Sequence, residues 1–225
     1  MRPAGRFTAT AFLVISGIIN YNCLHAQDPI SNPVLDEKVR KFLSDRSGGW
    51  YDMNIPTRDG QLLYDLIIKG NYKCALEIGT STGHSGIWIA WALSKTGGKL
   101  ITIEIDPDRH REALRNFREA GLSDYIDARL ADAHELVKEL KGPFDFVFSD
   151  ADKEWYKNYF TDLDPKLKTG GCFTAHNVSE RGRGGYGSYG GQGIFLEYIK
   201  SLKNYETTVN NSGGGVSVSY KKADN

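Results

Sequence analysis

Two short segments carry residues whose types and spacing suit the binding of a nucleoside. Residues 76–85 read Leu-Glu-Ile-Gly-Thr-Ser-Thr-Gly-His-Ser, an apolar strand that runs into a glycine loop and opens a helix. Glycine lets a backbone approach a ligand closely, and the free amides at a helix start bind polar or anionic groups. Ile101–Glu104 is a second apolar strand, and its terminal carboxylate can accept both hydroxyls of a ribose. Together the two segments predict a site for a nucleoside-containing cofactor.

The spacing of the glycines and the neighbouring acid indicate which cofactor to expect. A dinucleotide-binding loop has the pattern G-x-G-x-x-G, which lets the backbone touch a pyrophosphate. Here Gly79 and Gly83 are spaced G-x-x-x-G, and Glu77 stands just before the loop. A carboxylate in this place repels a pyrophosphate and suits an ammonium or sulfonium group. The sequence therefore favours S-adenosylmethionine over a nicotinamide cofactor.

Strands and helices alternate along most of the chain. Because parallel strands need helical crossovers, this alternation predicts a doubly wound α/β fold with a mostly parallel sheet. Two short strands around Asn210–Gly213 predict an antiparallel hairpin at the C-terminal edge of that sheet. The expected strands are 74–78, 100–104, 126–130, 144–149, 171–175, 207–209 and 216–220. The expected helices cover 33–46, 57–70, 84–93, 107–120, 133–140, a stretch from about 153, and 194–202.

Residues 1–26 have the pattern of a cleavable signal peptide. Arg2 and Arg6 precede a mostly apolar run over residues 7–19, and a plausible cleavage site follows Ala26. The run is shorter than the ~20 apolar residues of a membrane span, so we expect no stable membrane insertion. We expect export to the periplasm or the medium, with residues 27–225 as a single domain. An amphipathic N-terminal helix and a cytoplasmic location are the alternative.

The charge balance argues against a nucleic-acid partner. The chain has 28 basic and 28 acidic residues, and residues 1–26 hold two arginines and no acid. The mature chain would therefore carry a net charge of −2 and no broad basic surface. The oligomeric state stays open between a monomer and a homodimer.

Several motifs follow one another in a specific order over roughly residues 50–180. They are Met53-Asn54-Ile55 with Gly60-Gln61, Leu76–Ser85, Ile101–Asp108, Asp145–Tyr156, and Gly170-Gly171 with Asn177. In this series the chain resembles the small O-methyltransferases related to catechol and caffeoyl-CoA O-methyltransferases. The resemblance implies S-adenosylmethionine-dependent methyl transfer to a hydroxyl of a small acceptor, with an aromatic acceptor favoured. It also places the strand after Pro143 between the first strand and the strand after Gly170.

That strand order bears on the cysteines of the mature chain. Cys74 and Cys172 would start two strands that another strand separates. With strands about 4.8 Å apart, the two cysteines would lie about 10 Å apart, too far for a disulfide. We expect both to be small core residues.

The resemblance also assigns residues to the cofactor. Glu104 would hold the ribose, and Ile105 would lie against the adenine, which Asp132 and Ala133 would border. The residues expected around the methionine end of the cofactor are Glu77, Gly79, Thr80 and Ser85, and Ile55 and Ser81 are also expected to bind the cofactor.

By the same resemblance, three residues belong to the reaction centre. Asp150 would lie between the cofactor and a divalent metal, Asn177 would be a second metal ligand, and Lys153 would be the general base. A hard cation held by carboxylate and amide oxygens lowers the pKa of an acceptor hydroxyl. Each residue also has a plainer interpretation, because Asp150 could cap the following helix and Lys153 could be a solvated lysine.

One position departs from the family pattern. The residue before Asn177 is an aspartate metal ligand in the family, whereas this chain has His176. A histidine ligand favours manganese, iron or zinc over magnesium. Alternatively, the metal is lost and His176 is a base, or His176 is a hydrogen-bonded residue without a catalytic role. Because S-adenosylmethionine is made in the cytoplasm, export also leaves open an exported, non-catalytic ligand-binding protein on this fold.

Overall fold

The structure is a computed structural model, and it describes residues 30–180 and 190–224. The predicted signal peptide, residues 1–26, lies outside the described residues. Within the two described stretches, none of the helices combines the length and the apolar character needed to cross a bilayer.

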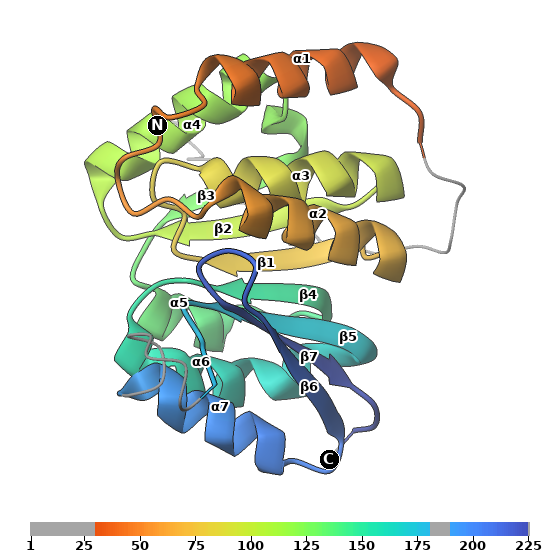
Figure 1. Ribbon diagram of the computed structural model, residues 1–225, viewed down its shortest axis with the longest axis vertical. Coiled ribbons are helices and arrows are strands. Elements are labelled where there is room, and N and C mark those ends of the chain that lie inside the picture. Colours follow the sequence, from red (N-terminus) through yellow and green to blue (C-terminus); the bar gives the residue numbers. More distant parts are fainter. Residues whose placement is uncertain (1–29, 181–189, 225) are drawn as a thin grey trace, which may run out of the picture.

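In the described part of the chain, a twisted sheet of seven strands runs through the molecule (Figure 1). The strands are β1 (Cys74–Ile78), β2 (Lys99–Glu104), β3 (Ile126–Leu130), β4 (Phe144–Ser149), β5 (Leu167–His176), β6 (Tyr205–Asn210) and β7 (Val216–Lys221). Their order is β3-β2-β1-β4-β5-β7-β6. The first five strands are parallel, and β7 runs antiparallel to both of its neighbours. The predicted doubly wound sheet with an antiparallel edge is confirmed.

Helices cover both faces of the sheet. The α-helices of the described residues are α1 (Pro33–Asp45), α2 (Thr57–Gly70), α3 (His84–Thr96), α4 (Pro107–Ala120), α5 (Ala133–Glu139), α6 (Tyr156–Leu163) and α7 (Gly191–Ser201). Hydrophobic side chains of α5, α6 and α7 pack against one face of the sheet, and those of α2 and α3 pack against the other. Helix α1 packs outside this layer, against α3 and α4 (Figure 1).

Most predicted boundaries agree with the structure within three residues, and two of the differences have clear physical reasons. Strand β5 is longer than residues 171–175 because it pairs with β4 from Leu167 and with β7 as far as His176. Helix α7 begins three residues before the predicted Ile194, within the glycine-rich stretch. There the carboxylate of Glu154 accepts a hydrogen bond from the amide of Gly191, at 3.1 Å, and so caps the helix start.

The two cysteines of the described residues have different states. Strand β4 separates β1 from β5 as expected, and Cys172 is a free, buried thiol. Cys74, in contrast, is disulfide-bonded, so its interpretation as a plain core residue is wrong.

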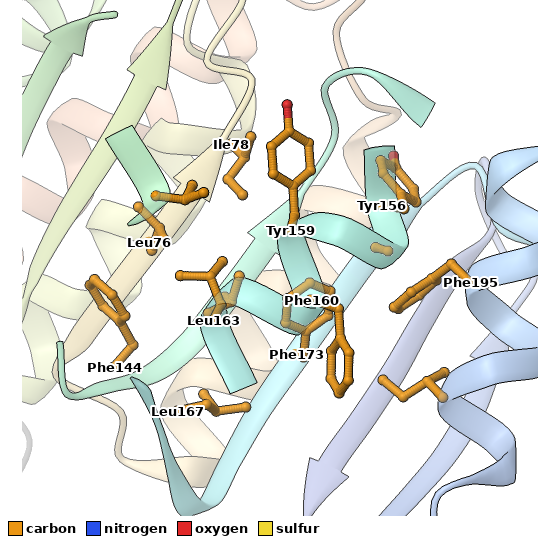
Figure 2. Close-up of a cluster of buried hydrophobic side chains, with 14 of the residues drawn as sticks. Leu76, Ile78, Phe144, Tyr156, Tyr159, Phe160, Leu163, Leu167, Phe173 and Phe195 are labelled. Atoms are coloured by element: carbon orange, nitrogen blue, oxygen red, sulfur yellow. The ribbon is translucent and has the colours of Figure 1, made fainter. Parts of the chain in front are cut away.

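Aromatic side chains dominate the core between the sheet and α6 and α7 (Figure 2). Phe160, only 1% exposed, meets Phe173 edge to face with ring centroids 5.2 Å apart, and it meets Tyr205 in the same way at 5.1 Å. Such edge-to-face pairs stabilise beyond the burial of their area. This cluster holds α6, and with it the segment that follows β4, against the sheet.

Helix α3 is buried along its whole length, between the sheet and α1 and α4. The ring of His84, at its start, donates from Nδ1 to the carbonyl of Ile55 at 3.0 Å. Its Nε2 accepts from the indole of Trp88 at 3.1 Å, and the ring of Trp50 stacks on it with centroids 4.5 Å apart. Burial lowers the pKa of His84 to about 4, although the hydrogen bond to Ile55 alone would raise this pKa. The neutral ring therefore fixes the segment before α2.

Truncation of the central aromatic ring should destabilise the fold strongly. We expect Phe160→Ala to lower the free energy of unfolding by about 3–5 kcal/mol, because it removes buried contacts and leaves a cavity. Leu114→Ala, at a side chain that is 39% exposed, is the control and should cost well under that amount. Urea denaturation of the three proteins measures both changes. Equal losses for the two variants would contradict the assignment of Phe160 to the core.

Acid should weaken the fold through His84. The unfolded chain protonates this ring near pH 6.5 and the folded chain only near 4. Between these values the unfolded state binds more protons, so the free energy of unfolding falls as the pH drops. The loss should reach at most about 3 kcal/mol.

The measurement is the difference between the wild type and His84→Gln in denaturation curves from pH 7.5 to 4. The difference is needed because burial raises the pKa of Glu77 to about 8, and this group changes stability in the opposite direction over an overlapping range. The part of the slope that His84 causes should be absent from the variant, which keeps the opposite dependence of Glu77. A pH dependence that is the same in both proteins would show that His84 is not the group responsible.

Candidate active site

A cavity of about 660 Å³ lies at the edge of the sheet where the parallel strands end. Ligands of open α/β sheets bind at this edge. Ten of the predicted site residues line the cavity: Gly79, Ser81, Glu104, Ile105, Asp132, Ala133, Asp150, Lys153, His176 and Asn177. Four others, Ile55, Glu77, Thr80 and Ser85, lie behind its wall.

The glycine loop lies between the ends of β2 and β4. Its first two amides, those of Gly79 and Thr80, donate to the carbonyl of Ile103 at 3.0 and 3.1 Å. Gly79 has a φ of +96°, and a Cβ on it would lie 2.9 Å from the backbone of Asp150. Only glycine allows this approach. The loop therefore brings the cofactor side of the cavity against Asp150.

The carboxylate of Glu104 is held in place at the end of β2. One oxygen accepts from the amide of Ser81 at 2.7 Å, and the other accepts from the amides of Ile105 and Asp106 at 3.0 and 2.9 Å. Three backbone donors fix the orientation of this acceptor before any ligand arrives. The side chain borders the cavity, as a ribose-binding carboxylate must.

Glu77 differs from its predicted position. Its side chain is fully buried on the α3 side of the sheet, where one oxygen accepts from Thr102 Oγ1 at 2.5 Å and the other has no partner. Burial raises the pKa of Glu77 to about 8, although hydrogen bonds from Ser85 and Thr102 oppose this rise. The alternation of side chains along β1 turns Glu77 away from the cavity. Its carboxyl group lies inside the protein and does not face the cavity.

A segment before α2 closes one wall of the cavity. Asp52 forms a bidentate ion pair with Arg109 of α4, with N–O distances of 2.8 and 2.9 Å, and its carbonyl accepts from Ser81 Oγ at 2.5 Å. Asn54 donates to Thr82 Oγ1 at 2.8 Å. The motif Met53-Asn54-Ile55 pointed to this segment, whereas nothing in the sequence singled out Asp52 and Arg109 as partners.

Residues that follow the ends of β2, β3 and β4 line another part of the cavity, where apolar, aromatic and acidic side chains lie together. Ile105, 66% exposed, presents its side chain at the cavity, and Asp132 caps α5 by accepting from the amide of His134 at 2.9 Å. His134 lies between Asp132 and Asp152, with N–O distances of 3.1 Å to each. Its ring lies parallel to that of Tyr159. Asp152, His134 and Tyr159 also line the cavity and were missed by the sequence prediction.

Lys153 lies directly after β4, in a short 3₁₀ turn over Lys153–Trp155. Its Nζ forms an ion pair with Asp150 Oδ1 and donates to the hydroxyl of Tyr156 at 3.1 Å. Tyr156 in turn donates to the carbonyl of His176 at 3.0 Å. The ammonium is thus positioned by two neighbours and still reaches the cavity. The structure brings the predicted base and Asp150 together.

His176, at the end of β5, lies between two carboxylates. Its Nδ1 is 3.2 Å from Asp150 Oδ2, and its Nε2 is 2.9 Å from Asp59 Oδ2. Burial opposes a charged ring, but the hydrogen bonds to Asp150 and Asp59 outweigh it and raise the pKa of His176 to about 9. Asp59 belongs to the first turn of α2 and is fully buried. The sequence prediction did not include it.

The residues predicted to hold a divalent metal do not fit one in this arrangement. Both oxygens of Asp150 already face cations, one at Lys153 and one at His176. Asn177 lines the cavity beside them. Among the described residues, no group of three or more His, Cys, Asp or Glu side chains is arranged to hold a metal ion.

Comparisons with known proteins place this site in a family. The model of the O-methyltransferase family matches residues 26–184. A catechol O-methyltransferase of Niastella koreensis is 37% identical over 135 residues, which cover 58% of this chain and 61% of that protein. A caffeoyl-CoA O-methyltransferase of Eucalyptus globulus is 34% identical over 134 residues, covering 57% of this chain and 54% of the other. The chain thus spans about three fifths or less of the length of these two relatives.

Solved structures share the fold. A putative O-methyltransferase from Klebsiella pneumoniae superimposes with a TM-score of 0.68 at 24% identity, covering 86% of this chain and 92% of the other. An O-methyltransferase from Bacillus cereus, in complex with SAH, gives a TM-score of 0.67 at 23% identity, with the same coverage. The family model matches well over half of the chain and includes every strand of the cavity edge. The resemblance predicted from the ordered motifs is therefore confirmed, and the chain belongs to the O-methyltransferase family.

Proposed function

We propose that this chain transfers a methyl group from S-adenosylmethionine to a hydroxyl of a small acceptor, and that an aromatic acceptor is favoured. One observation carries the proposal. The Gly79 loop, the carboxylate of Glu104 and the Asp150–Lys153 pair, which come from the ends of three neighbouring strands, line one cavity. The part of the cavity that suits a nucleoside therefore lies close to the part that can accept a proton. One bound cofactor and one bound acceptor can reach both parts together.

The residues present fit the cofactor. Gly79 lines the cavity and lets the loop lie against the backbone of Asp150, Glu104 offers oriented acceptors for a ribose, and Ile105 offers an apolar face for a base. The Bacillus cereus structure is a complex with SAH, and a structure of the O-methyltransferase TomG from Streptomyces achromogenes is a complex with SAM. When bound, S-adenosylmethionine supplies an electrophilic methyl group.

The chain's own residues orient the acceptor and move its proton. Methyl transfer is an in-line displacement, so holding the acceptor oxygen in line with the methyl group provides much of the catalysis. Once it has given up its own proton, Lys153 Nζ has a lone pair placed to take the hydroxyl proton, and Asp150 and Tyr156 fix its position. The segment Asp52–Ile55 shields the cofactor side of the cavity from water, because it is tied to the glycine loop.

The class of acceptor rests on two supports. The relatives named above are a catechol and a caffeoyl-CoA O-methyltransferase. In this chain, Met53, 67% exposed, and Pro56 add apolar surface to the cavity. Purified protein should therefore bind S-adenosylmethionine in calorimetry and methylate members of a panel of catechols and phenols with labelled cofactor. Cofactor binding without any turnover would instead favour a ligand-binding protein.

Removal of the ribose acceptor should weaken cofactor binding. We expect Glu104→Ala to lower the affinity for S-adenosylmethionine by about 1.5–3 kcal/mol, the usual loss for hydrogen bonds to a charged group. Glu139→Ala, at an exposed position of α5, is the matched control and should bind as the wild type does. Isothermal calorimetry measures both. An unchanged affinity in Glu104→Ala would exclude Glu104 as the ribose ligand.

We also propose that the chain is exported after cleavage behind Ala26. The family match begins at residue 26, next to the proposed cleavage site, which supports a domain that starts there. Expressed with its own N-terminus in a bacterial host, the protein should leave the cytoplasm and begin at Gln27. Intact-mass analysis decides this. A full-length cytosolic product would refute export.

A further inference from the structure

The imidazole of His176 has a carboxylate oxygen at each of its two nitrogens. Nδ1 faces Asp150 at 3.2 Å, and Nε2 faces Asp59 at 2.9 Å. A neutral imidazole has one N–H and one lone pair, so it would turn a lone pair toward one of these oxygens. Only a ring that carries a hydrogen on each nitrogen can donate to both of these oxygens. The geometry thus describes a cation bridging two carboxylates, with its charge inside the protein.

Asp59 is enclosed by helix α2, by the β6–β7 turn and by the ring of His176. It is fully buried in the first turn of α2, and its Oδ2 also accepts from the amide of Gly214 at 2.7 Å. The turn between β6 and β7 closes over the pair, since a Cβ on Gly213 would lie 2.0 Å from Asp59 Oδ1, and one on Gly214 would lie 2.7 Å from His176 Nε2. A buried carboxylate needs hydrogen-bond donors or a positive group close to it to offset its desolvation. The amide of Gly214 and the ring of His176 are these partners of Asp59.

The same bridge leaves Asp150 without a free oxygen. Its Oδ2 faces His176 and its Oδ1 faces Lys153, so each carboxylate oxygen already meets a positive group. A divalent ion placed here would meet the charges of the ring and the ammonium at short range. Because like charges repel strongly in a partly buried site, the bridge and a metal exclude one another.

We propose that the imidazolium of His176, anchored by Asp59, replaces the divalent cation of the family, so that this chain methylates without a metal. In this arrangement His176 orients Asp150, and Asp150 orients Lys153 toward the acceptor hydroxyl. Asp59 is a positioning residue, because it acts only through His176. The part of the proposal that concerns turnover rests on the proposed function, whereas the part that concerns metal binding does not.

The first test measures metal binding directly. Elemental analysis of the purified full chain should find no stoichiometric divalent metal, and calorimetry with Mn²⁺ should show no binding. His176→Asp returns an oxygen ligand to this position and should bind Mn²⁺ at least about tenfold more tightly than the wild type. Should this variant fail to fold by circular dichroism, His176→Asn is the substitute, with the same expectation. A wild type that holds one metal per chain would overturn the proposal, as would equal Mn²⁺ affinities of the wild type and the folded variant.

The second test addresses positioning. Asp59→Asn keeps the size of the side chain but removes its charge, and we expect a roughly 10- to 100-fold lower kcat, as for partners that orient an active-site group. The Kd for S-adenosylmethionine should stay within about twofold, because Asp59 does not touch the cofactor side of the cavity. Asp65→Asn, an exposed position of the same helix, is the matched control.

The readouts separate the two proposals. An excess of chelator should leave wild-type turnover unchanged, and loss of turnover that Mg²⁺ or Mn²⁺ restores would overturn the metal-free site. An unchanged kcat in Asp59→Asn would overturn its positioning role. Absence of turnover on every acceptor, with or without metal, would count against the proposed function alone, since the metal-binding measurements would still stand.

Discussion

The close approach of Gly79 to the backbone of Asp150 sets the arrangement of the whole cavity. Strands β1 and β4 are neighbours in the middle of the sheet, and the chain leaves both at the same edge. Because Gly79 has no Cβ, the loop after β1 can lie directly on the first residue after β4. The two proposed functions of the cavity, holding a nucleoside and placing a base, would therefore meet across a single backbone contact. A larger residue at this point would separate them.

Around that contact, the charged groups are arranged in two different ways. Glu104 is oriented by backbone amides, so it stays an acceptor that faces the cavity. Asp150 is oriented by the side chains of Lys153 and His176, so its charge is neutralised by ion pairs within the protein. Backbone donors leave a carboxylate able to bind a neutral hydroxyl, whereas cationic partners leave it little affinity for a further cation. This difference explains why one carboxylate of the cavity suits a ligand and the other suits a structural role.

The sequence was sufficient for the regular elements and for one layer of the site. The limits of β1 and β4 were predicted to the residue, because the apolar run of β1 stops at Gly79 and that of β4 lies between Pro143 and Asp150. Glu77 was misplaced because Gly79, two residues later, lines the cavity, while the alternation of a strand turns Glu77 to the other face of the sheet. Asp59 was missed because an aspartate in the first turn of a helix is ordinary in a sequence. Only the fold brings it to His176, 117 residues away.

The position of Asp59 also gives the antiparallel edge of the sheet a function. The β6–β7 turn carries three successive glycines, and two of them lie against Asp59 and His176 with no room for a side chain. The turn contributes a backbone amide to Asp59 and closes the buried bridge. The replacement of one aspartate by His176 therefore does not stand alone. It depends on a buried acid from α2 and on a glycine turn from the opposite end of the chain, and both would be unfavourable if His176 were an aspartate. An acid there would face Asp59 and Asp150 with no internal cation between them, and the site would then need one from solution.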